Sequence, residues 1–299
     1  MTTTRAGAPL RIGALVLGFS FLYAPIVLLV FYSFNASRLV TVWAGFSIRW
    51  YGELMKNEAF RAAAVTSLEV AAMAATLSLV LGTLAGFSIA RFSRFPGRLL
   101  FGFALLAPLV VPEIILGLSL LLFFVACEGW VGWPAGRGIT TITIAHATFG
   151  ACFVAVLVRA QLVSFDRTLE EAALDLGARP WTVLTRITLP GISPALVSGW
   201  LLAFTLSLDD LVVASFVNGP SATTLPMAVF SSVRLGVSPE VNALATLFLA
   251  LVFVLVSLAA WRMARAERRR QTSSQELPSP ASLRSAPSPA VREWGDPAL

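Results

Sequence analysis

SFDRTLEEAALDLGARPWTVLTRITLP, residues 164–190, is the segment that decides the fold, because it is polar and helix-forming and lies between two long apolar runs. Thr168 and Glu171 have the spacing of a capping box, and acidic residues suit the positive end of a helix dipole. Gly177 can take the left-handed conformation that ends a helix. Pro180 then suits the first turn of a second helix. The segment therefore predicts a short helix, a turn and a second helix.

Six apolar windows surround this segment, each long enough to cross a bilayer, which takes about 20 residues. They are Ile12 to Phe34, Ala62 to Ala90, Leu99 to Val125, Ile139 to Val158, Ile192 to Val213 and Val241 to Met263. The first window is too long for the core of a signal peptide and lacks a cleavage pattern, so we expect it to be retained. The sequence predicts an all-α, polytopic membrane protein with six transmembrane helices.

Composition excludes several other classes of protein. Of the 299 residues, 57% are hydrophobic and only 13% charged, and the mean hydropathy is +0.80. Soluble domains carry about a quarter charged residues, so a cytosolic enzyme, a disordered chain and a coiled coil are excluded. Two cysteines and one histidine are too few for a metal cluster, and no P-loop is present, so we expect no metal, no cofactor and no ATP hydrolysis by this chain.

Basic residues predict the orientation of the helices. With the N-terminus inside, sixteen of the 22 Lys and Arg residues fall in cytoplasmic segments and six outside. Cytoplasmic loops carry the excess of basic residues, so both termini are predicted to be cytoplasmic. Because the arginines lie between apolar runs, this topology explains the net charge of +6 better than binding to nucleic acid does.

This topology divides the chain into five segments. They are a cytoplasmic tail at 1–11, the first transmembrane helix at 12–34, an external loop with an interfacial helix at 35–61, a five-helix core at 62–264 and a disordered cytoplasmic tail at 271–299. The interfacial helix places Trp50 and Tyr51 at headgroup level. The final tail is rich in Pro and Ser and cannot bury apolar surface.

The segment 164–190 resembles the EAA motif of ABC-importer permeases, E-A-A-x3-G-x9-I-x-L-P. The matching residues are Glu171, Ala172, Ala173, Gly177, Ile187, Leu189 and Pro190, without gaps. Residues 200–220 and 224–246 resemble the polyamine branch of these permeases. Residues 39–54 are more similar to putrescine permeases than to spermidine permeases. The resemblance covers roughly residues 10–270.

This resemblance implies a fold, partners and a location. The fold would be that of a type I ABC-importer (MetI-like) permease in a bacterial inner membrane. The loop would be a coupling helix that docks on an ATPase, through Glu170, Glu171, Ala172, Ala173, Gly177, Leu189 and Pro190. The implied partners are a cytoplasmic ABC ATPase dimer, a second permease subunit and a periplasmic or extracellular substrate-binding protein. The chain itself would be a non-catalytic subunit.

Four acids inside the predicted spans are candidate substrate contacts, because such residues mark transport paths. They are Glu69, Glu113, Asp209 and Asp210, and on continuous helices all would lie in the outer half of the membrane. No intramembrane Lys or Arg can neutralise them, which implies a cationic ligand or protonated acids. Glu113 could instead be a protonated acid bonded to a neighbouring helix, and the aspartates a solvated helix end. Glu69 is the least expected in the family.

The predicted substrate path combines these acids with neutral contacts. It consists of Glu113, Asp209 and Asp210, with Ser207 as a hydrogen-bond partner and Trp50 as a cation–π contact near the entrance. The resemblance then implies an importer of a polyamine, putrescine first. Two alternatives remain: a permease for another small solute, such as spermidine, thiamine or ferric iron, and a stand-alone secondary transporter that uses the acids as a cation relay.

Overall fold

The computed structural model describes residues 8–39, 42–92, 94–220, 222–236, 238–250, 253–254, 257 and 261. These residues form helices and connecting loops, and the single β-bridge among them pairs Asn35 with Phe46. The all-α prediction is therefore confirmed. The chain divides into two units, 1–30 with 244–299, and 31–243.

The first unit contains most of α1 (Ala8–Tyr32), which ends two residues before the predicted boundary at Phe34. Its side chains are almost all exposed within the chain, as expected of a helix whose apolar surface faces lipid or a partner. The predicted sixth span at 241–263 is described only in part, within an apolar helix over Pro239–Ala250. The predicted tail at 271–299 lies outside the described residues.

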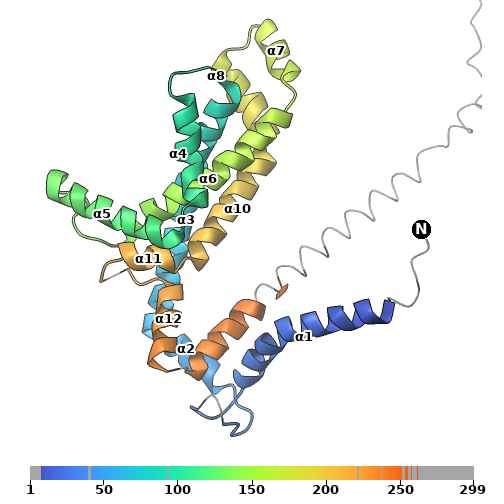
Figure 1. Ribbon diagram of the computed structural model, residues 1–299, viewed down its shortest axis with the longest axis vertical. Coiled ribbons are helices and arrows are strands. Elements are labelled where there is room, and N and C mark those ends of the chain that lie inside the picture. The colour runs from blue at the N-terminus through green and yellow to red at the C-terminus, as the bar shows by residue number, and fades with distance from the viewer. Residues whose placement is uncertain are drawn as a thin grey trace, which may run out of the picture. The chain divides into compact units, whose positions relative to one another are not determined.

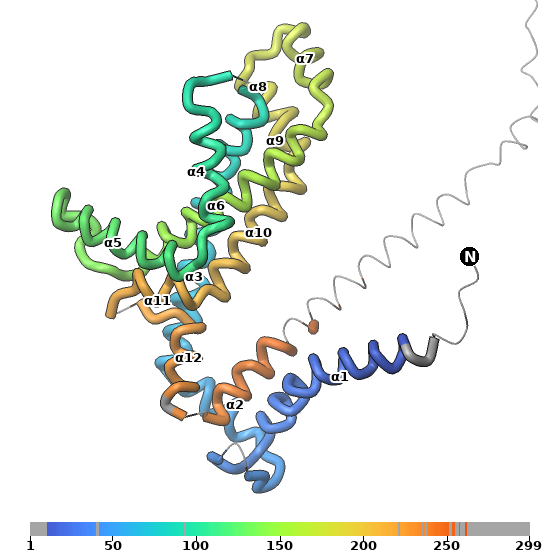
Figure 2. The backbone as a smooth tube through the Cα atoms, in the orientation of Figure 1, coloured from blue at the N-terminus to red at the C-terminus, as the bar shows by residue number. Residues whose placement is uncertain are grey.

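The second unit is a helical bundle. Its elements are α2 (Arg49–Lys56), α3 (Glu58–Arg91), α4 (Arg98–Val110), α5 (Glu113–Val131), α6 (Ile139–Ser164), α7 (Thr168–Asp175), α8 (Pro180–Val183), a π-helical turn (Leu184–Thr188), α9 (Leu189–Gly191), α10 (Ser193–Asp209), α11 (Val212–Val217) and α12 (Leu225–Leu235). Figure 1 shows α3, α6 and α10 running side by side, and these three helices pack against one another. Figure 2 shows α7, α8 and α9 at one end of this bundle, away from α5 and α11.

Small residues allow the central helices to approach closely. A Cβ atom on Gly82 would lie 2.6 Å from the carbonyl oxygen of Ala151, and one on Gly86 would lie 2.7 Å from that of Ala155. Helices in membranes associate through such close packing because lipid supplies no hydrophobic drive between them. The α3–α6 interface therefore forms the centre of the unit, and it holds the elements on either side of the bundle in place.

The predicted third span is not one helix. The sequence analysis treated Leu99 to Val125 as continuous, but α4 ends at Val110, Val111 is extended and α5 begins at Glu113. Pro112 explains the break, because proline has no N–H to donate and pushes the residue before it out of the helical region. The height predicted for Glu113 on a continuous helix is therefore wrong, since Glu113 lies in the first turn of a new helix.

The predicted fifth span also ends early. Helix α10 stops at Asp209, Asp210 is extended, and a short α11 follows. Four described helices are long and apolar enough to cross a membrane, and a fifth is counted if the pair Pro180–Gly191 and Ser193–Asp209, bent by 67°, forms one span. Proline residues near this bend match the predicted interruption of the backbone.

Candidate functional site

Glu113 and Asp210 line one cavity, although 97 positions separate them in the chain. The cavity has a volume of 240 Å³. The break after α4 and the break after α10 place the two acids there, Glu113 at the start of α5 and Asp210 in the extended residue after α10. The other lining residues are Pro108, Leu109, Val111, Pro112, Leu116, Phe149, Phe153, Leu206 and Val213. Two acids among apolar and aromatic side chains suit a ligand that carries positive charge on an apolar body.

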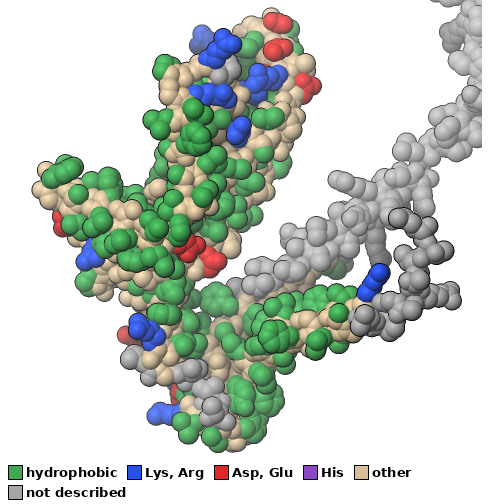
Figure 3. Space-filling model, in the orientation of Figure 1, with side chains coloured by type: hydrophobic (Ala, Val, Ile, Leu, Met, Phe, Trp, Pro, Cys, Tyr) green, Lys and Arg blue, Asp and Glu red, His purple; other side chains and the backbone are tan. Residues whose placement is uncertain are grey.

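Asp210 also stabilises the local backbone. Its Oδ1 accepts a hydrogen bond from the Ala214 N–H at 3.0 Å, which satisfies a free donor at the start of α11. Figure 3 shows acidic side chains gathered near this end of α10, over α11. Asp209 is exposed at the last position of α10. The two aspartates therefore differ, and only Asp210 lines the cavity.

His146, which was not among the predicted site residues, lies behind Asp210. The imidazole is fully buried on α6, with Nδ1 2.7 Å from Ser207 Oγ and Nε2 3.6 Å from Asp210 Oδ1. At 3.6 Å the second contact is longer than a hydrogen bond, and Nε2 has no hydrogen-bond partner. Ser207 was predicted to contact the ligand, but its hydroxyl bonds His146 and is buried. A sequence signal did exist, since His146 is the only histidine of the chain and lies in an apolar helix.

Two other predicted contacts lie apart from this cavity. Trp50 is 3% exposed, donates its indole N–H to the Asn35 carbonyl at 2.6 Å and carries the Arg49 guanidinium 5.3 Å from its ring centre. The ring is therefore not open to a ligand or at an exposed headgroup position, and the structure corrects that expectation. Glu69 is exposed on α3 and does not line the cavity.

The segment 164–190 folds as a helix, a turn and a second helix, as predicted. Gly177 has a φ of +83°, and the bonds from Gly177 N–H to Leu174 O and from Ala178 N–H to Ala173 O form a Schellman motif. Pro180 is the first residue of α8. The capping box is wrong, because Asp166 caps α7 instead: its Oδ1 accepts bonds from the Thr168 N–H and hydroxyl. These bonds lower the pKa of the exposed Asp166 carboxyl.

Glu170 joins this loop to the bundle. Its Oε1 lies 2.7 Å from Arg91 Nη2, at the end of α3, and accepts a 2.7 Å bond from the Thr188 hydroxyl. Both charged side chains are largely buried, with 10% of Arg91 and 16% of Glu170 exposed. Glu170 is therefore held inside the chain, whereas Glu171 and Ala172 are exposed.

The outer surface of the loop is apolar at several points. Leu176 is 89% exposed and Trp181 is 71% exposed, with Leu169 and Leu174 half exposed nearby. Large apolar side chains gathered at a polar end of a molecule indicate a protein interface. Figure 3 shows basic and acidic side chains around this end of the bundle, next to α7.

Sequence comparisons give relatives across most of the chain. The putrescine transport system permease protein PotI of Escherichia coli (strain K12) is 59% identical over 263 residues, covering 88% of this chain and 94% of that protein. The spermidine/putrescine transport system permease protein PotC of the same strain is 40% identical over 266 residues, covering 89% and 98%.

A solved structure of similar fold is a bacterial ABC transporter involved in the import of the acidic polysaccharide alginate. Its TM-score is 0.65 at 18% identity, and the match covers 88% of this chain and 99% of that one. This likeness supports the predicted permease fold. The relatives are named as permeases, which agrees with the prediction of a non-catalytic membrane subunit.

A family model provides the last comparison. The model for the binding-protein-dependent transport system inner membrane component matches residues 78–272, a range that includes the predicted EAA loop and the cavity residue Asp210. The resemblance to ABC-importer permeases is thereby confirmed. This chain is a multi-pass membrane protein that belongs to the family of binding-protein-dependent transport system inner membrane components, within its spermidine/putrescine branch.

Proposed function

We propose that this chain is the permease subunit through which an ABC importer moves a small diamine, putrescine, across a bacterial inner membrane by alternating access. The observation that carries the proposal is the pair of acids, Glu113 and Asp210, in one cavity with Phe149 and Phe153. No Lys or Arg lines that cavity among the described residues. The relatives named above transport putrescine or spermidine, which agrees with a cationic ligand.

The geometry of the cavity suits an amine with an apolar middle. A carboxylate accepts charge-assisted hydrogen bonds from an ammonium group, and each is worth about 1.5–3 kcal/mol. Aromatic rings add cation–π attraction to the same group. Asp209, exposed at the end of α10, would meet the amine outside the cavity before Asp210 does. Ser207 would act indirectly, through His146.

The loop 164–190 is the proposed site of coupling to the ATPase. Its exposed Glu171 and Ala172, with Leu176 and Trp181, would dock on a cytoplasmic ATPase dimer. Glu170 and Arg91 would transmit the movement of the docked loop to α3, because their ion pair joins the two. Gly177, Leu189 and Pro190 would shape the loop. A second permease subunit and an external substrate-binding protein complete the proposed assembly, with both termini of this chain in the cytoplasm.

The proposal is tested by uptake of radiolabelled putrescine in cells that express the chain with its partner subunits. Asp210→Asn should keep the bond from Ala214, since an amide oxygen still accepts it, and remove only the charge. Uptake should fall about tenfold or more for Asp210→Asn and again for the double variant with Glu113→Gln.

Glu69→Gln is the matched control, because it removes an acid from an exposed position of α3 outside the cavity. It should leave uptake unchanged. Full uptake by the double variant, at equal protein level, would contradict the proposal. Uptake that persists without the ATPase and stops with a protonophore would favour a secondary transporter, and stronger competition by spermidine or another solute would change the assigned substrate.

A further inference from the structure

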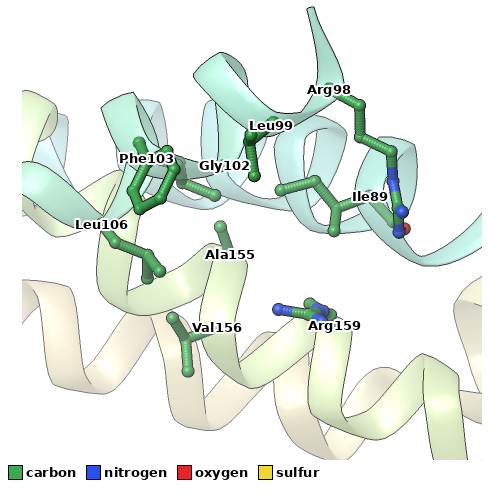
Figure 4. A pocket seen from close by; sticks show the side chains of 10 residues that line it. Ile89, Arg98, Leu99, Gly102, Phe103, Leu106, Ala155, Val156 and Arg159 are labelled. Atoms are coloured by element: carbon green, nitrogen blue, oxygen red, sulfur yellow. The ribbon is translucent and has the colours of Figure 1, made fainter. Parts of the chain in front are cut away.

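A second cavity lies on the side of the bundle that carries the loop 164–190. It has a volume of 430 Å³ and is bounded by the end of α3, by α4 and by α6. Figure 4 shows the guanidinium groups of Arg98 and Arg159 at the same end of it, while Phe103, Leu106 and Val156 lie at the other end. The cavity is therefore polar and positively charged at one end and apolar along the rest.

The two arginines have no acidic partner in the described part of the chain. The ion pairs there join Arg49 to Glu53, Arg91 to Glu170 and His146 to Asp210. Arg98 donates one bond, from Nη2 to the Ile89 carbonyl at 3.2 Å, and a guanidinium has five donors. Most of the donors at this end remain available. This contrasts with Arg91, which the loop carboxylate of Glu170 neutralises.

The cavity also lies at a defined depth. Arg98 is the first residue of α4, and Arg159 lies five residues before the end of α6, about 8 Å along the helix. Both charges are thus close to the loop end of the helices, and the apolar part extends toward their middle. In a membrane this arrangement places positive charge at headgroup level and apolar walls at the level of the acyl chains.

We infer that this cavity binds one anionic phospholipid of the cytoplasmic leaflet, with the phosphate between Arg98 and Arg159 and an acyl chain along Phe103, Leu106 and Val156. Two guanidinium groups match a phosphate, since each presents a fork of N–H donors. Basic pockets between helices on the cytoplasmic side are a known type of lipid site. The inference rests on the proposed orientation of the chain, but not on the transported solute.

Gly102 offers a test that leaves both charges in place. It lines the cavity on α4, and a Cβ atom there would meet nothing within 4 Å. Gly102→Leu should therefore fold, since leucine favours a helix more than glycine does, while its side chain occupies the space meant for the acyl chain. A site for free phosphate would be insensitive to this change.

The experiment measures binding of fluorescent phosphatidylglycerol to the purified, assembled transporter in mixed micelles, against phosphatidylcholine and inorganic phosphate as competitors. The wild-type chain should prefer phosphatidylglycerol. Arg98→Gln with Arg159→Gln should weaken that binding about tenfold or more, since each basic residue near a membrane contributes about 1 kcal/mol. Gly102→Leu should weaken it as well. Arg94→Gln, an exposed arginine outside the cavity, is the charge-matched control and should bind normally.

Four outcomes would overturn the inference. Equal binding of the two phospholipids would remove the role of the headgroup charge, and normal binding by the double glutamine variant would remove the role of the arginines. Competition by inorganic phosphate, with Gly102→Leu unaffected, would assign the site to free phosphate. Absence of binding in the assembled transporter would mean that the second permease covers the cavity. None of these readouts depends on putrescine or ATP, so failure here is distinct from failure of the proposed transport function.

Discussion

Two acidic regions of the same helical unit have opposite surroundings. At the loop end, Glu170 has Arg91 and Thr188 each at 2.7 Å and is largely buried. At the cavity, Glu113 and Asp210 have no Lys or Arg within ion-pair distance among the described residues, and the nearest basic side chain recorded is His146 at 3.6 Å from Asp210. One region neutralises its acid within the chain and the other does not.

The comparison distinguishes an acid that supports the structure from an acid that is available to a ligand. A buried carboxylate with a basic partner is already satisfied, so its removal leaves the partner charge unpaired and costs stability. An acid without such a partner carries a cost of burial that a cationic ligand can offset. Mutations should therefore affect stability at the loop end and transport at the cavity.

The largest effect on stability is expected from Glu170→Ala. This change leaves Arg91 almost buried without its partner, which costs about 3–5 kcal/mol, and thermal unfolding of the purified protein measures it. Replacing both residues, Arg91→Leu with Glu170→Leu, should be milder because no charge is left alone. If the single variant unfolds at the wild-type temperature, the pair does not hold the loop to α3, and the contrast between the two regions disappears.

An intermediate effect is expected from Ser207→Ala, which removes the partner of His146 Nδ1. A buried nitrogen left without its hydrogen bond costs about 1–3 kcal/mol. The matched control is Thr205→Ala on the same helix, whose exposed hydroxyl bonds only the Leu201 carbonyl. Unfolding temperature and putrescine uptake should both fall for Ser207→Ala and hold for Thr205→Ala. A fall in uptake with no change in unfolding would instead favour direct contact between Ser207 and the solute.

The smallest effect on stability is expected from Gly177→Val in the loop. The site is open, so the cost is only the left-handed backbone, about 1–2 kcal/mol for a side chain, and more for a β-branched one. Gly177→Asn should be tolerated better. Assembly should survive in both, while uptake and transport-stimulated ATP hydrolysis fall together in the valine variant. Normal stimulation in Gly177→Val would argue against docking through this turn.

Local sequence patterns predicted some of these features well, because the determinants were neighbours in the chain. Gly177 and Pro180 needed only their own backbone preferences to end one helix and begin another. The capping box failed because Asp166, two residues upstream, competes for the same backbone donor and accepts the Thr168 hydroxyl as well. The third span failed because an apolar average does not register the break that Pro112 imposes.

Hydrophobicity, the arginine pattern and the spacing of the EAA motif determined the class of this protein from its sequence, because each depends on residue type and local order alone. Only the tertiary structure decided which acids act together. The pairing of Glu113 with Asp210, the support of Asp210 by His146 and the neutralisation of Glu170 by Arg91 all join residues more than 60 positions apart. Such contacts arise where helices pack and break, and no local preference of a single segment specifies them.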